Sequence, residues 1–224
     1  MQSLFSFIDV QLKSSLIWQL RYYFITVLAL ILAASIALLS SDKTTIHLSI
    51  NAAHSPFADF FFTYWTYVGD GIFVALAGIV IALILFPKYK WLPLWFGAAT
   101  LLLSGAAAQL LKRFVFEDAL RPSLYLSEHS LYIVEGVEIH GNHSFPSGHT
   151  TAAFAFFAFA SLFLARKNKV LQFVFALFAG LVGYSRMYLS QHFLEDVLAG
   201  MLLGSAIFIL LVLVSKRPLS ELNA

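Results

Sequence analysis

The chain has 224 residues, of which 60% are hydrophobic and only 12% are charged, and its mean hydropathy is +0.82. Soluble domains carry roughly 25% charged residues, so this composition excludes a soluble protein and predicts an integral membrane protein. The formal net charge of +2 argues against a nucleic-acid partner, and the lack of cysteine excludes disulfides and thiolate chemistry. We expect residues 1–224 to form a single domain.

The first 21 residues carry apolar side chains at a helical period, with polar residues between them. This pattern is typical of an amphipathic helix that lies in the membrane interface. We therefore expect an interfacial helix over residues 1–21.

Six long apolar runs follow the interfacial segment. Each run approaches or reaches the roughly 20 residues that a helix needs to cross the bilayer. The sequence thus predicts an all-α polytopic membrane protein with six transmembrane helices and with both termini on the same side. The runs lie near residues 22–40, 64–86, 92–113, 148–165, 170–188 and 193–215.

The basic residues predict how these helices are oriented. If the N-terminus is cytoplasmic, nine lysine and arginine residues lie at cytoplasmic ends and five at outer ends. This distribution obeys the positive-inside rule. We therefore expect both termini in the cytoplasm.

The two long outer segments differ in polarity. Residues 41–63 mix apolar and polar side chains and are expected to lie along the membrane surface, whereas residues 114–145 form the longest polar segment. His140 and His143 in this segment do not predict a metal site, because such a site wants three or four ligands and nothing nearby completes the set. Asp70, near the outer end of the second run, is either a functional carboxylate or a hydrogen-bonded interfacial one.

The fourth apolar run begins directly after a Pro-Ser-Gly-His motif at residues 146–149. A helix N-terminus offers free N–H groups and the positive end of the helix dipole, which suit a phosphate. Gly148 allows close approach of the backbone, Ser147 adds a hydroxyl donor, and His149 adds a group that moves protons near neutral pH. The alternative is that Ser147 only caps the helix and that His149 is an interfacial histidine.

A second cluster lies between the fifth and sixth runs. His192 and Asp196 are four residues apart, so on a helix they share one face, where the carboxylate can hold one ring nitrogen. The other ring nitrogen is then available as a nucleophile. Glu195 could also reach the ring, so the spacing leaves both carboxylates open. We expect the Asp196 carboxylate to raise the pKa of His192.

These motifs resemble the signatures of the type 2 phosphatidic acid phosphatase (PAP2) superfamily. Pro-Ser-Gly-His at residues 146–149 resembles the second signature, and Ser-Arg-x5-His-x3-Asp at residues 185–196 resembles the third. Together with the first signature, the resemblance covers residues 112–196. It implies a helical membrane bundle of the PAP2 type.

The first PAP2 signature, Lys-x6-Arg-Pro, is present in altered form. Arg121 is followed by proline as in the signature, but Phe114 stands where the lysine is expected. Lys112 and Arg113 are the nearest basic residues, so the segment before Arg121 is one or two residues too long. We favour Lys112 for this position on residue type.

The resemblance also implies the roles of the site residues, with a phosphohistidine intermediate, no cofactor and no metal. His192 would attack phosphorus while Asp196 holds its ring, and His149 would protonate the leaving oxygen. The groups implied to bind the phosphate are Lys112, Arg121, Ser147, Gly148 and Arg186.

The implied substrate is a lipid phosphate or diphosphate, whose headgroup reaches the outer end of the bundle while its tail stays in the bilayer. Undecaprenyl diphosphate ranks first, ahead of phosphatidylglycerophosphate, phosphatidic acid and lipid A. The compact chain resembles bacterial members, which implies the inner membrane with the site on the periplasmic face. A lipid phosphotransferase with the same site and a six-span anion transporter are the alternatives, although a carrier would have little use for a His192–Asp196 pair.

Overall fold

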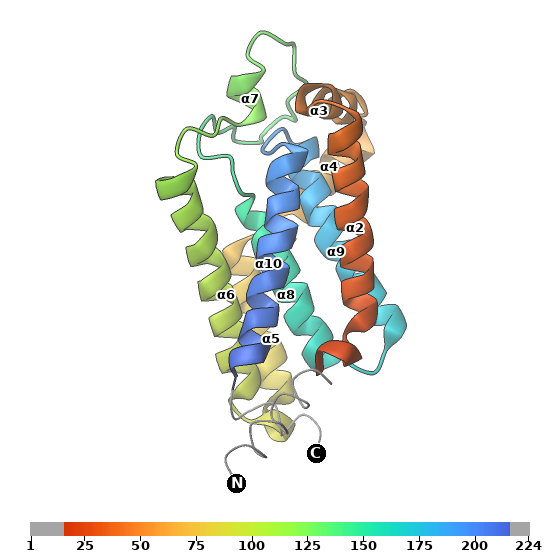
Figure 1. Cartoon of the computed structure of the whole chain (residues 1–224), viewed down its shortest axis with the longest axis vertical. Coiled ribbons are helices and arrows are strands. Elements are labelled where there is room, and N and C mark those ends of the chain that lie inside the picture. Colours follow the sequence, from red (N-terminus) through yellow and green to blue (C-terminus); the bar gives the residue numbers. More distant parts are fainter. Residues whose placement is uncertain (1–15, 216–224) are drawn as a thin grey trace.

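The computed structural model describes residues 16–215, and this range contains helices and loops but no strand. The long helices lie side by side in an elongated bundle, with short elements gathered at one end (Figure 1). The interfacial helix predicted for residues 1–21 falls largely outside the described residues. In chain order the elements are α2 (Arg21–Ser40), α3 (Lys43–Ala52), α4 (Pro56–Trp65), the 3₁₀ turn η1 (Thr66–Gly69), α5 (Gly71–Tyr89), α6 (Leu92–Leu110), the π-helical turn η2 (Leu111–Val115), α7 (Pro122–Tyr125), α8 (Gly148–Leu164), α9 (Lys169–Tyr188) and α10 (Leu194–Val214).

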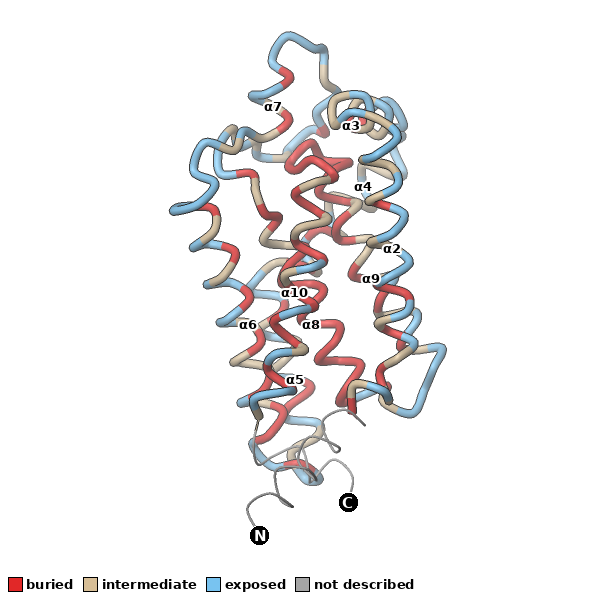
Figure 2. The backbone as a smooth tube through the Cα atoms, in the orientation of Figure 1, coloured by how far each residue is buried: buried red, intermediate tan, exposed pale blue. Residues whose placement is uncertain are grey.

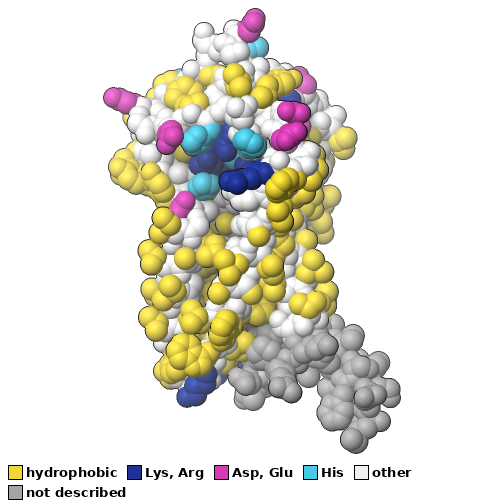
Figure 3. Space-filling model, turned by 90° about the vertical axis from the view of Figure 1, so that its left-hand side faces the viewer, with side chains coloured by type: hydrophobic (Ala, Val, Ile, Leu, Met, Phe, Trp, Pro, Cys, Tyr) yellow, Lys and Arg dark blue, Asp and Glu magenta, His cyan; other side chains and the backbone are white. Residues whose placement is uncertain are grey.

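Five of the helical segments are long and apolar enough to cross a membrane. Apolar side chains cover the flank of the bundle, whereas basic, acidic and histidine side chains gather near one end (Figure 3). Such a distribution is that of an integral membrane protein, as the composition predicts. The five segments are Arg21–Ser40, Gly71–Tyr89, Leu92–Val115, Lys169–Tyr188 and Leu194–Val214.

The second predicted apolar run is not one continuous helix. A 3₁₀ turn over Thr66–Gly69 follows α4, and the helix that could cross the membrane is Gly71–Tyr89. Between them Asp70 has an extended backbone, and its Oδ1 accepts a hydrogen bond from Ile72 N at 2.8 Å, which caps α5. This helix therefore starts later than predicted, and the turn before it becomes part of the polar end of the bundle.

The central helix is α8, which packs against α10, α9 and α6. Every residue from Thr150 to Phe163 is buried, as Figure 2 shows along the tube. α10 approaches α8 closely because Gly200 faces it: a Cβ there would lie 2.9 Å from Ser147 O. This approach brings the N-terminal ends of the two helices together, and Ser147 N donates to Asp196 O at 3.0 Å.

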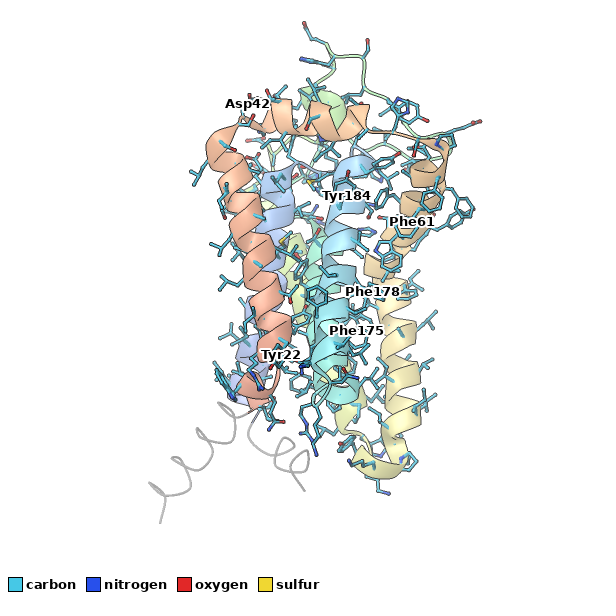
Figure 4. All side chains as sticks on the ribbon, turned by 90° about the vertical axis from the view of Figure 1, so that its right-hand side faces the viewer. Tyr22, Asp42, Phe61, Phe175, Phe178 and Tyr184 are labelled. Carbon is cyan, nitrogen blue, oxygen red and sulfur yellow. The ribbon has the colours of Figure 1, made fainter. Side chains whose placement is uncertain are left out.

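The segment predicted to lie along the surface forms α3 and α4. Asp42, labelled in Figure 4, accepts a hydrogen bond from Thr45 N at 3.0 Å and starts α3, which lies across the end of the bundle. α4 then leads back along the bundle, where Trp65 stacks on Phe61 at 5.3 Å and meets Phe178 of α9 edge-on at 5.1 Å. These aromatic contacts fix α4 and the following 3₁₀ turn against α9.

Candidate active site

The helix N-terminus predicted at the Pro-Ser-Gly-His motif is present. α8 begins at Gly148, and Ser147 is its cap: Ser147 Oγ lies 3.4 Å from Thr150 N and accepts the Thr150 hydroxyl proton at 2.8 Å. Ser147 is fully buried, whereas a Cβ on Gly148 would meet no atom within 4 Å. Ser147 is therefore a helix cap, and the space beside Gly148 is open.

His192 and Asp196 meet as their spacing predicts, although His192 lies just before α10 and only Asp196 belongs to it. Nδ1 of His192 is 3.2 Å from Asp196 Oδ2. The same carboxylate oxygen accepts hydrogen bonds from Ser144 Oγ and, at 2.9 Å, from Phe193 N. The carboxylate is thus fixed by three donors, which leaves Nε2 of His192 as the ring nitrogen available for chemistry.

Glu195, the other carboxylate within reach by sequence, is occupied elsewhere. It pairs with Lys43 of α3, with 3.0 Å between Glu195 Oε1 and Lys43 Nζ. The Lys43 ammonium also lies 4.4 Å from the ring centroid of Tyr125 and 4.9 Å from that of Phe193. The sequence left open which carboxylate contacts His192. In the structure Asp196 does so, while Glu195 pairs with Lys43 of α3.

The surroundings of His192 favour its neutral form. Burial lowers the pKa of His192, and the nearby cations Lys112, Arg121 and Arg186 lower it further. The expectation that Asp196 would raise this pKa is wrong in its net direction, because the side chain is almost completely buried and three cations act on it. A neutral imidazole is the form that a nucleophile needs.

Lys112 lies in the π-helical turn that ends α6. A hydrogen bond of 2.9 Å from Phe116 N reaches back five residues to Leu111 O, so the turn holds one more residue than an α-helical turn. This extra residue accounts for part of the altered spacing of the first signature. Lys112 is buried and its Nζ donates to His143 O at 2.7 Å, whereas Arg113 is exposed. Lys112, as favoured from the sequence, is the residue that points inwards.

The two arginines of the cluster are each held by a hydrogen bond from another part of the chain. Arg121 donates from Nε to Asn142 O and from Nη1 to Gln191 Oε1, both at 3.0 Å. Arg186 donates from Nη1 to Thr66 Oγ1 at 2.7 Å, and its buried Nε has no partner in the described residues. A buried guanidinium N–H without a partner is poised to bind an anion.

His149 is the more open of the two histidines. Its side chain is 30% exposed, and its Nε2 lies 4.0 Å from Asp70 Oδ2. Electrostatic interactions link it to Arg186 and His192, so it belongs to the same cluster. Asp70 is thus a hydrogen-bonded carboxylate that caps α5, and its side chain also faces His149.

Comparison with known proteins places this geometry in a family. A sequence model of the PAP2 superfamily matches residues 93–219. This chain belongs to the PAP2 superfamily. The lipid A 4'-phosphatase of Bacteroides thetaiotaomicron is 31% identical over 75% of each chain. The phosphatidylglycerophosphatase B of Bacillus subtilis is 42% identical over 30% of this chain. This match covers only 36% of that relative's length, about a third.

The fold agrees with solved structures of the same superfamily. The crystal structure of the first transmembrane PAP2 type phosphatidylglycerolphosphate phosphatase from Bacillus subtilis superimposes with a TM-score of 0.61 and is 26% identical, covering 87% of this chain and 94% of that chain. The chain is therefore a PAP2-type phosphatase with an all-helical membrane fold.

One contact with the loop of His192 that sequence reasoning missed comes from α3. His47 is 1% exposed, its Nε2 lies 3.2 Å from Ser190 Oγ, and its ring meets that of Phe193 at 5.3 Å. Asn51 of α3 reaches the same Ser190 Oγ at 3.2 Å. These contacts hold the loop that carries His192 on both sides of that residue. Burial lowers the pKa of His47 to about 4, so it acts as a neutral hydrogen-bonding group.

Two further side chains of the PAP2 site were not predicted. Thr66 sits in the 3₁₀ turn before α5, and nothing in its local sequence marks it as the partner of Arg186. Ser144 lies two residues before the first residue of the Pro-Ser-Gly-His motif, which was the available signal, but its bond to Asp196 depends on the approach of α10.

A polar groove opens beside the cation cluster. Its volume is about 660 Å³, and both Lys112 and Arg121 lie on its wall. Figure 3 shows the hollow, with lysine, arginine and histidine side chains around it. His140 and His143 also line the groove, and within residues 16–215 no cluster of three or more side chains suited to a metal ion is found. The groove thus opens beside two of the three cations that act on His192.

Proposed function

We propose that the chain removes a phosphate from a membrane lipid through a phosphohistidine formed at His192. The observation that carries the proposal is the buried His192–Asp196 pair, in which Nδ1 is held and Nε2 is left available. Lys112, Arg121 and Arg186 all act on this ring. The names of the matched relatives, phosphatases of lipid A and of phosphatidylglycerophosphate, support a lipid phosphate as the substrate.

In the first step, Nε2 of His192 bonds to phosphorus as the bond between phosphorus and the leaving oxygen breaks. His149 gives a proton to that oxygen, so the lipid alcohol leaves neutral. Asp196 stabilises the positive charge that develops on the attacked ring. Lys112, together with the two arginines and the N-terminus of α8, binds the three phosphoryl oxygens in place.

In the second step, water attacks the phosphohistidine. His149 takes a proton from the water as its oxygen bonds to phosphorus, and the bond between phosphorus and Nε2 breaks. Inorganic phosphate leaves and His192 returns to its neutral form. Three side-chain cations supply the positive charge for both steps, so we propose that no metal is needed.

We propose that α8 is a sixth membrane span. Its 17 residues are about 25 Å long, slightly less than a hydrocarbon core of roughly 30 Å. Because neighbouring helices bury it almost completely, it needs no lipid-facing surface of its own. With six spans and the basic residues at the inner ends, the site lies on the periplasmic face of a bacterial inner membrane and both termini are cytoplasmic.

The test is phosphate release by the purified protein from a panel of lipid phosphates and diphosphates, with and without a chelator. We expect release that the chelator leaves unchanged and that vanadate, which imitates five-coordinate phosphorus, inhibits competitively. Acid-labile, base-stable labelling of the protein by a ³²P-labelled lipid should be lost in His192→Ala. Labelling that persists in this variant would disprove His192 as the nucleophile, and activity restored by a divalent ion would disprove the metal-free mechanism. Transfer of the label to a second lipid would indicate a phosphotransferase.

A further inference from the structure

The groove beside the cation cluster contains an arginine that the proposed reaction does not use. Arg113 lines the groove and is exposed. Its guanidinium has no hydrogen-bond or ion-pair partner among residues 16–215. The residue follows Lys112 directly, and Gln109, Lys112 and Arg113 at i, i+3 and i+4 present one face to the groove. The end of α6 thus carries one buried cation for the reaction and one free cation beside it.

The groove is larger and more polar than a single phosphate requires. Sites of 300–1,000 Å³ are typical of whole ligands, and this groove measures about 660 Å³. The described residues that line it include three cations and no carboxylate. The segment from Ile139 to His143 also lines the groove and supplies an amide at Asn142 and imidazoles at His140 and His143.

The groups that line the groove differ in the chemistry that they offer to a ligand. Lys112 and Arg121 act electrostatically on His192, at which the reacting phosphate binds under the proposed function. Amide and neutral imidazole groups both donate and accept hydrogen bonds, as hydroxyl groups do. A guanidinium binds an anionic oxygen pair.

We propose that Arg113 binds a second anionic group of the substrate headgroup, separated from the reacting phosphate by a hydroxylated spacer such as glycerol or a sugar. The proposal rests on the proposed function and names the substrate class of the same site. It favours a phosphorylated glycerol or sugar headgroup over a simple phosphomonoester. It also separates the role of Arg113 from that of Lys112, although the two residues are adjacent.

The test compares phosphatidylglycerophosphate with phosphatidic acid, both with the same acyl chains, in micelles of an uncharged detergent. Both carry a terminal phosphomonoester, but only the first has a second anion, its phosphodiester, across a glycerol. We expect the wild-type protein to have the lower KM for phosphatidylglycerophosphate. Arg113→Gln should reduce this preference about tenfold, the scale of one lost charged hydrogen bond.

Two variants make the result specific. Arg113→Lys keeps the charge and should retain most of the preference. Lys167→Gln removes one positive charge from an exposed position on the turn between α8 and α9 and should leave the preference intact. Equal effects of Arg113→Gln on both lipids, or no effect on either, would overturn the subsite while the phosphatase function stands. Failure of the wild-type protein to release phosphate from either lipid would overturn the subsite, and failure on every lipid of the panel would overturn the proposed function as well.

Discussion

The two histidines of the site have different surroundings. The side chains of His192 and Asp196 are 2% and 3% exposed, and they are linked by a 3.2 Å contact. The side chains of His149 and Asp70 are 30% and 37% exposed, and their nearest charged atoms are 4.0 Å apart. One histidine is fixed before any substrate binds, whereas the other stands at the edge of the open part of the site.

This difference fits the division of work between a nucleophile and a proton donor. A nucleophile gains from a fixed ring and from exclusion of water, because the geometry of attack is then set in advance. A proton donor must meet leaving groups of different lipids and later a water molecule, so it needs an open space beside it. The following predictions test this division of roles and the contacts that support the buried histidine.

The largest effect is expected for the buried histidine. His192→Ala should lower kcat by about 10⁴-fold or more, because no other group can form the covalent intermediate. His149→Ala should cost much less on an aryl phosphate with a good leaving group than on a lipid phosphate. His129→Ala, at an exposed position of the outer loop, is the matched control. Equal losses of kcat in His192→Ala and His149→Ala on every substrate would contradict the different roles of the two histidines.

The next largest effect is expected for the carboxylate that holds the nucleophile. Asp196→Asn should lower kcat by about a thousandfold, because an amide neither fixes the same tautomer of His192 nor stabilises its positive charge. Glu195→Gln is a neighbouring control that only breaks the pair with Lys43 and should retain most activity. Steady-state kinetics of the two variants measures the difference. A greater loss of kcat in Glu195→Gln than in Asp196→Asn would mean that Glu195, and not Asp196, supports His192.

A smaller effect is expected for the buried cation. Lys112→Ala should cost about 1 to 3 kcal/mol in kcat/KM on phosphatidic acid, the scale of a lost charged hydrogen bond. Arg113→Ala should cost less on this substrate, which has no second anion. The reverse ranking would transfer the role in the first signature to Arg113.

The contact of α3 with the nucleophile loop should have an effect of about tenfold. His47→Ala removes one of the two side-chain partners of Ser190 Oγ and the packing on Phe193, so we expect a lower kcat with little change in KM. Ser49→Ala, at an exposed position of the same helix, is the control. The rate of phosphoenzyme formation in a single turnover should fall in parallel, whereas a purely structural role would lower the amount of active enzyme and leave that rate unchanged.

The smallest effect concerns pH. Burial and the three cations lower the pKa of His192 below its ordinary value near 6.5. Since the ring must be neutral to attack, the acid limb of kcat/KM should lie below pH 6.5. The same shift means that the folded state binds fewer protons than the unfolded state. The free energy of unfolding should therefore be undiminished by this group above pH 6.5 and should fall as the pH drops below that value. A fall in kcat/KM as the pH is lowered from 8 to 7 would contradict the lowered pKa of His192.

Much of the fold could be predicted from the sequence because its signals are local. Apolar length identifies the spans Arg21–Ser40 and Leu194–Val214 nearly to the residue. The start of α8 follows from the loop that ends at Ser147. The second span was harder, because Asp70 and the 3₁₀ turn before it interrupt an otherwise continuous apolar run.

For the candidate site, the sequence by itself determined the groups that neighbouring positions bring together: the N-terminus of α8, and the His192–Asp196 pair, which lies four residues apart across the start of α10. The tertiary structure decided what depends on distant segments. Lys43 pairs with Glu195 and so leaves Asp196 as the carboxylate beside His192. Thr66 is the partner of Arg186, and α3 holds the loop of His192. Such contacts depend on how closely whole helices approach, which small residues such as Gly200 set through packing. No single stretch of sequence contains that information, because both sides of each contact must be in place before it exists.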